Sequence, residues 1–267
     1  AGLLLMVLTG RAPVAPSATD WGWLMFATAC GIGGYAALVF ASGFLGAGAR
    51  QAAAAAAEAL GAAAIAGASA HGVLAGGAEE EERPAVAVLA LAGLAATPFR
   101  LPDLAGAEDA AGAELEAVLG GNARDGDLVV LLADPAALDM PRLLGALAGV
   151  LPPCSVVGAG AGPGGRSSLV WSGRTPVAEG ASGLVLHLER PAQILVSHGC
   201  RPITGPLEVT RVEGRWLLEI EGRPALLAYR EAAGDLLGAD LRRAGELVVV
   251  AMPRGEDFVV RPVAGFS

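Results

Sequence analysis

The sequence predicts an α/β or α+β protein in which mixed β-sheets are flanked by helices. Strand-like hydrophobic runs outnumber helical ones, and helices recur between them along the chain. Hydrophobic residues make up 54% of the chain and charged residues 17%, which excludes intrinsic disorder. The 267 residues are enough for one large domain or two modest ones.

The first half of the chain alternates strands with helices. Its strand-like runs are 36–42, 63–69, 85–92, 127–133 and 154–157. The nearly pure alanine run 51–60 is expected to be a helix because alanine has the highest helix propensity, and 109–119 is a second expected helix. Asp139 is placed to cap a third helix that carries Pro141 in its first turn and ends at Pro152-Pro153.

The second half is richer in short strands. The expected strands are 168–172, 183–188, 193–197, 207–212, 216–220, 246–251 and 258–262. Glu213-Gly214-Arg215 separates two of them and predicts a hairpin turn. Residues 224–237 have the pattern of an amphipathic helix, and Pro224 is allowed at its start.

Charge and residue usage exclude several functions. The net charge of −9 argues against a nucleic-acid partner, which needs clustered basic residues on one face. All 18 basic residues are Arg, so no chemistry that depends on a lysine is available. The three cysteines and three histidines lack metal-ligand spacing, so no metal is expected, and the odd cysteine count fits a reducing cytoplasm.

The uncharged run 21–49 is long enough to span a membrane. The glycines at 31, 33 and 34 interrupt it, and strand-like stretches flank them on both sides. Two buried strands joined by a glycine turn give the same hydropathy pattern, so we expect a soluble chain without a membrane partner.

Two glycine-rich turns resemble known motifs without fulfilling them. Residues 160–165 match a dinucleotide-binding fingerprint, but a strand follows them where that site requires a helix. The turn GASAH at 67–71 differs from a nucleophile elbow in its last residue. Ser69 therefore either faces a pocket at a strand end or is a small residue in a tight turn. His187, in an expected strand, fits a polar contact or a satisfied core position.

The run VSHGCRPITGP at 196–206 combines an imidazole, a thiol and a guanidinium in a loop braced by Pro and Gly. With the following VTRVEG and LEIEGRPAL it resembles the C-terminal half of FIST proteins, whose pattern is a GCRPIG segment, a strand and a helix opened by PAL. Thr204 departs from that pattern.

The N-terminal half resembles the same family in the expected order. The run AGASAHGVL at 66–74 is similar to its GCSAEGVI turn, with His71 in place of the acidic residue. Asp134-Pro135 is similar to its DP strand end, and VVGAGA at 156–161 to its VVGGLAS turn. The resemblance implies two related halves, compatible with a layered αββα arrangement. It places a FIST N-terminal domain at 21–188 and an incomplete FIST C-terminal domain at 189–267, with 1–20 unassigned.

FIST domains are regarded as sensory modules, so the resemblance implies a cytosolic module that binds a small ligand, an amino acid or related carboxylate, and signals to an output protein in trans. It implies no enzymatic activity and no cofactor. Two alternatives stay open. One is a heme-binding gas sensor with His198, His71 or Cys200 as axial ligand. The other is a hydrolase or transferase that uses Cys200 with His198. A reduced cysteine packed in a turn is the structural interpretation of Cys200.

The expected ligand site consists of six residues from the motif turns, namely Arg201, Cys200, His198, His71, Ser69 and Asp134. Arg201 is the expected anion contact because a guanidinium offers two parallel donors to a carboxylate and stays charged. A structural role for Arg201, in hydrogen bonds to loop carbonyls, is the alternative.

Overall fold

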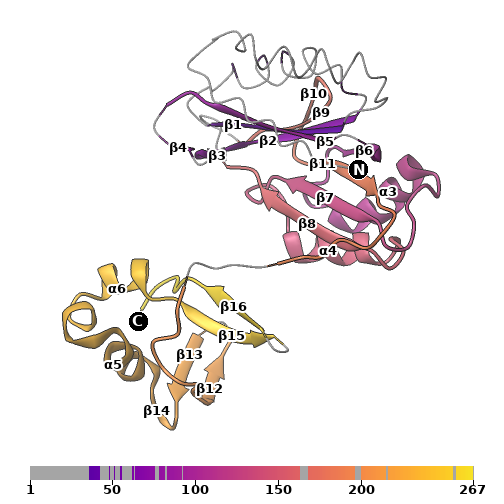
Figure 1. The fold of residues 1–267 in the computed structure, drawn as a ribbon. Helices are drawn as coiled ribbons and strands as arrows, with labels where there is room; N and C mark the ends of the chain where they lie inside the picture. The colour runs from indigo at the N-terminus through magenta and orange to yellow at the C-terminus, as the bar shows by residue number, and fades with distance from the viewer. Residues whose placement is uncertain are drawn as a thin grey trace. The chain divides into compact units, whose positions relative to one another are not determined.

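A computed structural model confirms the predicted mixture of helices and mixed sheets (Figure 1). It describes residues 36–42, 48, 51, 55, 62, 64–75, 78–81, 83–91, 93–162, 168–195, 200–214, 216–254 and 257–266. The chain divides into two compact units, 1–193 and 194–267, called unit 1 and unit 2 below.

Unit 1 carries most of the strands. Within its described residues the elements are β1 (Ala36–Ser42), β2 (Ala64–Ala70), β3 (Val73–Ala75), β4 (Ala78–Glu80), β5 (Val86–Leu91), β6 (Ala95–Leu101), the 3-10 helix η2 (Glu108–Ala110), α3 (Ala111–Leu119), β7 (Leu128–Ala133), α4 (Met140–Ala148), β8 (Ser155–Gly160), β9 (Val170–Ser172), β10 (Thr175–Val177) and β11 (Ala181–His187).

These strands form two main sheets. The first has the order β10-β9-β2-β1-β5 and the second the order β6-β11-β7-β8, while β3 and β4 form a separate hairpin. Each main sheet has one parallel pair, β1 with β2 and β7 with β8, and its other pairs are antiparallel. A parallel pair needs a crossover between its strands, and α4 lies in the crossover from β7 to β8.

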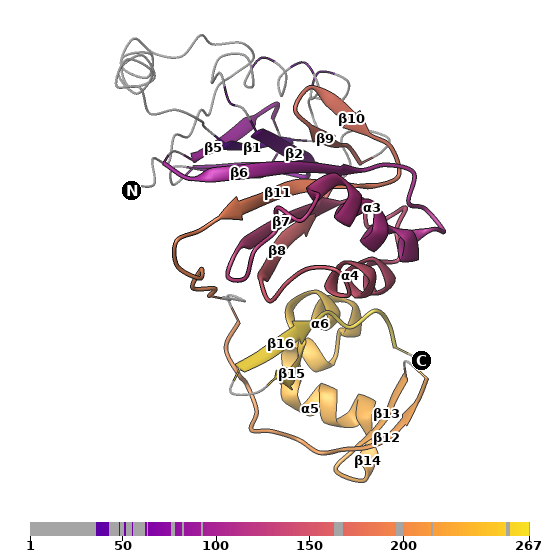
Figure 2. The same ribbon diagram turned by 90° about the vertical axis from the view of Figure 1, so that its right-hand side faces the viewer.

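The two sheets pack face to face (Figure 2). Alternation along β7 sends Val130 and Leu132 toward the first sheet, where they join one buried cluster with Ala66 and Ala68 of β2. The residues that β2 contributes to this inner face are alanines, so small side chains of β2 pack against larger aliphatic ones of the second sheet.

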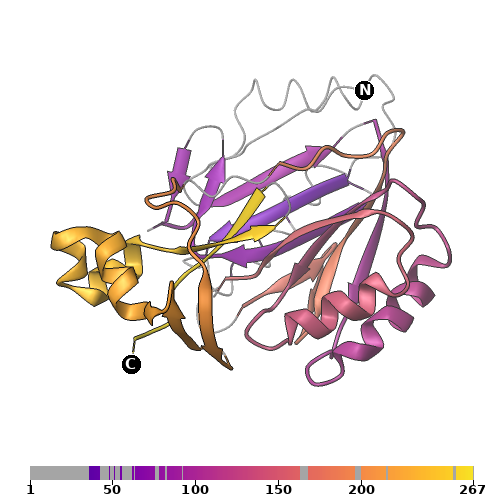
Figure 3. The same ribbon diagram turned by 90° about the horizontal axis from the view of Figure 1, so that it is seen from below.

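Helices α3 and α4 cover the other face of the second sheet (Figure 3). Leu115 of α3 and Leu143 of α4 are completely buried against Val129 and Leu131 of β7. The side chain of Asp139 caps α4 as expected, accepting a hydrogen bond from the Arg142 backbone N–H at 3.2 Å. Helix, sheet and sheet are thus three successive layers. The helix expected at 51–60 lies largely outside the described residues.

Unit 2 is smaller. Its elements are β12 (Val209–Glu213), β13 (Trp216–Ile220), β14 (Arg223–Pro224), α5 (Ala225–Gly238), α6 (Leu241–Leu247), β15 (Val250–Arg254) and β16 (Asp257–Arg261). Strands β12, β13 and β14 form one sheet, and β15 and β16 form a hairpin. The Tyr229 hydroxyl of α5 lies within hydrogen-bonding distance of the Ala244 and Val248 carbonyls, at 2.9 and 2.8 Å, and ties α5 to the end of α6.

Several expectations from the sequence needed correction. Residues 193–195, expected to begin a strand, have no regular structure, and the rest of that run lies outside the described residues. The strand expected at 246–251 begins only at Val250, because Asp240 caps α6 through the Arg243 N–H at 3.2 Å and the helix extends to Leu247. Strand β6 had not been predicted.

The run 21–49, for which a membrane span had been considered, lies mostly outside the described residues. Among the described helices, none has the length and hydropathy that crossing a membrane would require.

We expect Gly183→Ala to destabilise unit 1. A Cβ at position 183 would lie 1.9 Å from the Val130 carbonyl oxygen and 2.4 Å from Cζ of the buried Phe99 ring. Such overpacking costs about 1 to 3 kcal/mol, measured as the free energy of unfolding in urea. Gly145→Ala is the matched control, because nothing lies within 4 Å of the added methyl group in α4, and it should stabilise by about 0.5 to 1 kcal/mol. Equal effects of the two variants would contradict this packing.

We also expect the ionisation of Glu108 to make the free energy of unfolding fall as the pH is lowered into the acid range. The Asp139 N–H donates to this buried carboxylate at 3.0 Å and lowers its pKa, supported by the Gly106 N–H and Arg142. A lowered folded-state pKa gives stability that is present above the unfolded value of about 4.3 and is lost as the pH falls through the folded value. Glu108→Gln should therefore be less stable than wild type near neutral pH, with the gap closing in acid. Parallel stability curves between about pH 3 and pH 7 would exclude this role.

Candidate functional site

Ser69 and His71 lie at the carboxyl end of β2, where the two predicted glycine-rich turns meet. Ser69 is 1% exposed, and its hydroxyl donates to the Gly162 carbonyl at 2.6 Å and accepts from the Leu169 N–H at 2.8 Å. The Gly162 N–H in turn donates to the Ser69 carbonyl at 2.8 Å. Ser69 therefore fastens one motif turn to the other, while the following His71 is exposed to solvent.

Gly162 has no room for a side chain at this junction. A Cβ there would lie 2.8 Å from the His71 backbone nitrogen and 3.1 Å from the Ala70 Cα. The close backbone approach explains why glycine stands at position 162. Residues 163–165, the second half of the dinucleotide fingerprint, lie outside the described residues.

Asp134 follows β7 at the same end of unit 1. Its carboxylate accepts the Ala136 N–H at 3.0 Å, and its carbonyl accepts from Ala137 and Leu138. This hydrogen bonding shapes the turn between β7 and α4. Ser69 and Asp134 thus hold turns in place, and of the three predicted residues in unit 1 His71 has the most exposed side chain.

The predicted loop of unit 2 contributes to a pocket through its second half. Cys200 and Arg201 are exposed, and His198 lies outside the described residues. Ile203, Thr204 and Leu207 line a pocket of about 270 Å³, whereas Cys200 and Arg201 do not. The loop therefore takes part in the site through residues other than those selected from the sequence.

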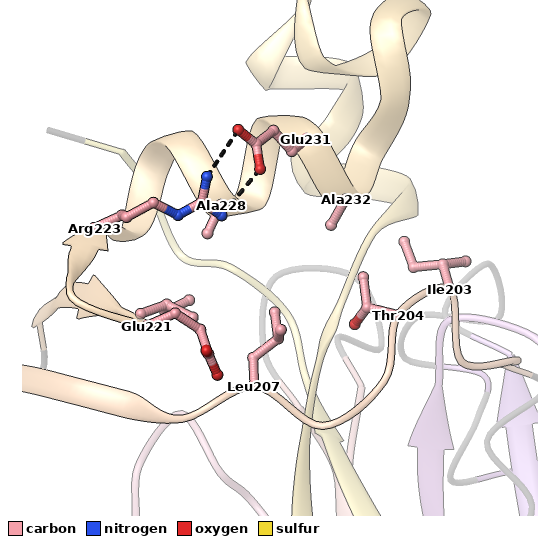
Figure 4. A pocket seen from close by; sticks show the side chains of 9 residues that line it. Ile203, Thr204, Leu207, Glu221, Arg223, Ala228, Glu231 and Ala232 are labelled. Atoms are coloured by element: carbon pink, nitrogen blue, oxygen red, sulfur yellow. Dashed lines mark hydrogen bonds and ion pairs between the residues drawn. The ribbon is translucent and has the colours of Figure 1, made fainter.

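The pocket lies between this loop, β13–β14 and α5 (Figure 4). Ile220 and Ala228 add to its apolar wall, with Ala232 beside them on α5. Opposite the loop, Arg223 and Glu231 form a two-pronged ion pair with both N–O distances at 3.0 Å. Glu231 raises the pKa of the Arg223 guanidinium further, so this cation is permanent.

Glu221 completes the polar side of the pocket. Its φ of 54° is a left-handed conformation that non-glycine residues rarely adopt. The turn is held there by two reciprocal hydrogen bonds with Glu208, each 2.8 Å long: one from the Glu221 N–H to the Glu208 carbonyl, the other from the Glu208 N–H to the Glu221 carboxylate. One guanidinium and two carboxylates therefore border a wall of aliphatic side chains.

Sequence reasoning missed Arg223 and Glu231. Glu231 lies in the predicted helix 224–237 and Arg223 directly before it, but eight positions separate them, and only the start of α5 brings them together. The sequence signal that could have indicated this ion pair is an Arg directly before a predicted helix together with a Glu in the second turn of that helix. Among the described residues, no group of three His, Cys, Asp or Glu side chains could hold a metal ion.

Comparison with known proteins connects the fold to a family. Residues 36–223 match the FIST N domain family. Uncharacterized proteins of Mycobacterium tuberculosis, from two strains, and of Mycobacterium bovis are 32% identical over 213 residues. These alignments cover 74% of this chain and 53% of each relative, so the chain spans about half the length of the curated relatives it matches. The FIST C-terminal domain expected at 189–267 stays a prediction.

We expect Ser69→Ala to lower the free energy of unfolding by about 1 to 3 kcal/mol, because it leaves buried carbonyl and N–H groups without their partner. His71→Ala, at an exposed neighbouring position, is the control and should change stability by less than about 0.5 kcal/mol. Urea unfolding of both variants provides the measurement. A neutral Ser69→Ala would mean that the hydroxyl does not hold the two turns together.

Proposed function

The chain belongs to the FIST N domain family, a family of sensory and signalling domains, and on that premise we propose that it is a sensory module that binds an amino acid in the unit 2 pocket. Binding of the ligand would change how the module interacts with a separate output protein. The observation that carries the proposal is the pairing of charges of both signs with an aliphatic wall in one small pocket.

Size and charge favour a zwitterion over a simple anion. A pocket of about 270 Å³ is smaller than the range of about 300 to 1,000 Å³ typical of drug-sized ligands, so it suits a small molecule. Glu221 and Glu231 outnumber Arg223, which disfavours a ligand with a carboxylate alone. An α-amino acid offers a carboxylate to Arg223, an ammonium group to the glutamates and a side chain to the aliphatic wall.

This proposal moves the anion contact from Arg201 to Arg223. Both are arginines and can make the same paired hydrogen bonds, but Arg223 lines the pocket. Arg223 is already oriented by Glu231, so less side-chain freedom is lost when a carboxylate binds. Arg201 is then a solvated charge on the same loop as the pocket wall.

Titration calorimetry with the standard amino acids tests the assignment. Arg223→Gln should weaken binding about tenfold or more, because the carboxylate loses its charged partner. Arg201→Gln is the matched control and should change the affinity by less than about twofold. The opposite ranking would return the anion contact to Arg201, and no heat with any amino acid would exclude this ligand class.

A further inference from the structure

A histidine with a carboxylate on one side and a hydroxyl on the other lies in unit 1. Nδ1 of His187 is 2.9 Å from Oδ2 of Asp127, and Nε2 is 2.9 Å from Oγ1 of Thr97. The side chain of His187 is 10% exposed and that of Asp127 is 2% exposed. We propose that this trio makes the Thr97 hydroxyl a nucleophile that accepts acyl groups from activated esters.

Sheet pairing brings the three residues together. His187 ends β11, the strand between β6 and β7 in the second sheet. The β11–β7 register places His187 one step beyond the Leu186–Leu128 pair, opposite Asp127, and Thr97 lies on β6, two residues from Ala95, which pairs with His187. The imidazole of His187 on β11 therefore lies between Thr97 of β6 and Asp127, the residue directly before β7.

The chemistry of Asp127 fixes the proton positions. An ionised carboxylate only accepts hydrogen bonds, so His187 donates from Nδ1 and leaves the lone pair of Nε2 facing Thr97. The Arg124 backbone N–H also donates to Oδ2 of Asp127 at 2.9 Å and helps to hold the carboxylate. The Thr97 hydroxyl then donates to Nε2, which is the arrangement of a nucleophile, a base and a positioning residue.

The hydroxyl is the group in this trio that an acyl donor can reach. Thr97 is partly exposed on β6, which lies at the edge of the second sheet, whereas Asp127 is buried. The thiol of Cys154, which also neighbours Asp127, is a poor competitor because burial raises its pKa and the charges of Asp127 and Asp125 raise it further.

The proposed step balances as follows. Oγ1 of Thr97 forms a bond to the carbonyl carbon of the ester while its proton passes to Nε2 of His187. The bond from that carbon to the leaving oxygen breaks, and the leaving group departs as an alkoxide or phenoxide that takes up a proton. Water activated by the same histidine can then release the acyl group as a carboxylic acid.

The test uses p-nitrophenyl acetate on the full chain, with the adduct localised by tandem mass spectrometry. The absence of lysine helps, because no ε-amino group competes for acetyl. Wild type should gain an acetyl group on Thr97, and Thr97→Ser should keep the reaction. Thr97→Val should lose it, and His187→Gln should slow it about 100-fold or more. Asp127→Asn should slow it as well.

Thr175→Val is the matched control, since Thr175 is an exposed strand threonine in β10 and should not affect labelling. Thermal melts establish that each variant is folded before its rate is compared. A wild-type chain that carries no adduct on Thr97 and releases p-nitrophenolate no faster than folded Thr97→Val overturns the proposal. An unchanged acylation rate in folded His187→Gln overturns the role of the histidine.

Discussion

The close approach of the two sheets in unit 1 is the constraint on which the rest of this structure depends. Only 4% of the residues are aromatic, so the core is filled by bringing backbones together rather than by large side chains. Alanines on β2 face the aliphatic side chains of β7 and β11. The two largest fully buried rings lie on the other faces of the two sheets, each beside a glycine: Trp171 beside Gly67 and Phe99 beside Gly183. A residue without a side chain, Gly162, likewise allows the turns after β2 and β8 to come into direct backbone contact.

The elements that sequence reasoning found are those with a local signal. Hydrophobic runs predicted β1, β5 and β7, and the Asp139 cap with Pro141 predicted α4. Strand β6 was missed because Pro98 interrupts its run, and proline is tolerated mainly on edge strands, which is where β6 lies. Helix α6 was missed because its apolar pattern is short and its cap, Asp240, follows another helix directly.

The sites were harder to predict because their members are far apart in the sequence. The loop carrying Thr204 was selected as a candidate segment, but the residues that line the pocket could not be chosen without knowing where α5 passes. The sequence allowed two interpretations of Ser69, a residue that faces a pocket or a small residue in a tight turn. Its hydrogen bonds to Gly162 and Leu169 give it a structural role in the turn. His187 was interpreted as a polar contact or a satisfied core position, and both of its ring nitrogens have polar partners. Those partners, 90 and 60 positions away in the sequence, are brought to it by the register of the sheet.

The two units differ in how many large apolar side chains they bury, so their amide protons should exchange with solvent at different rates. Among the described residues of unit 2, the buried apolar side chains are three alanines, Ala225, Ala228 and Ala244, whereas unit 1 buries tryptophan, phenylalanine and many leucines. Amide protons in α5 should therefore exchange through openings of low free energy, well before those of β7 and β11. A molecule held against α5 would slow that exchange in proportion to its occupancy, so the protection of the α5 amides would itself report the concentration of ligand.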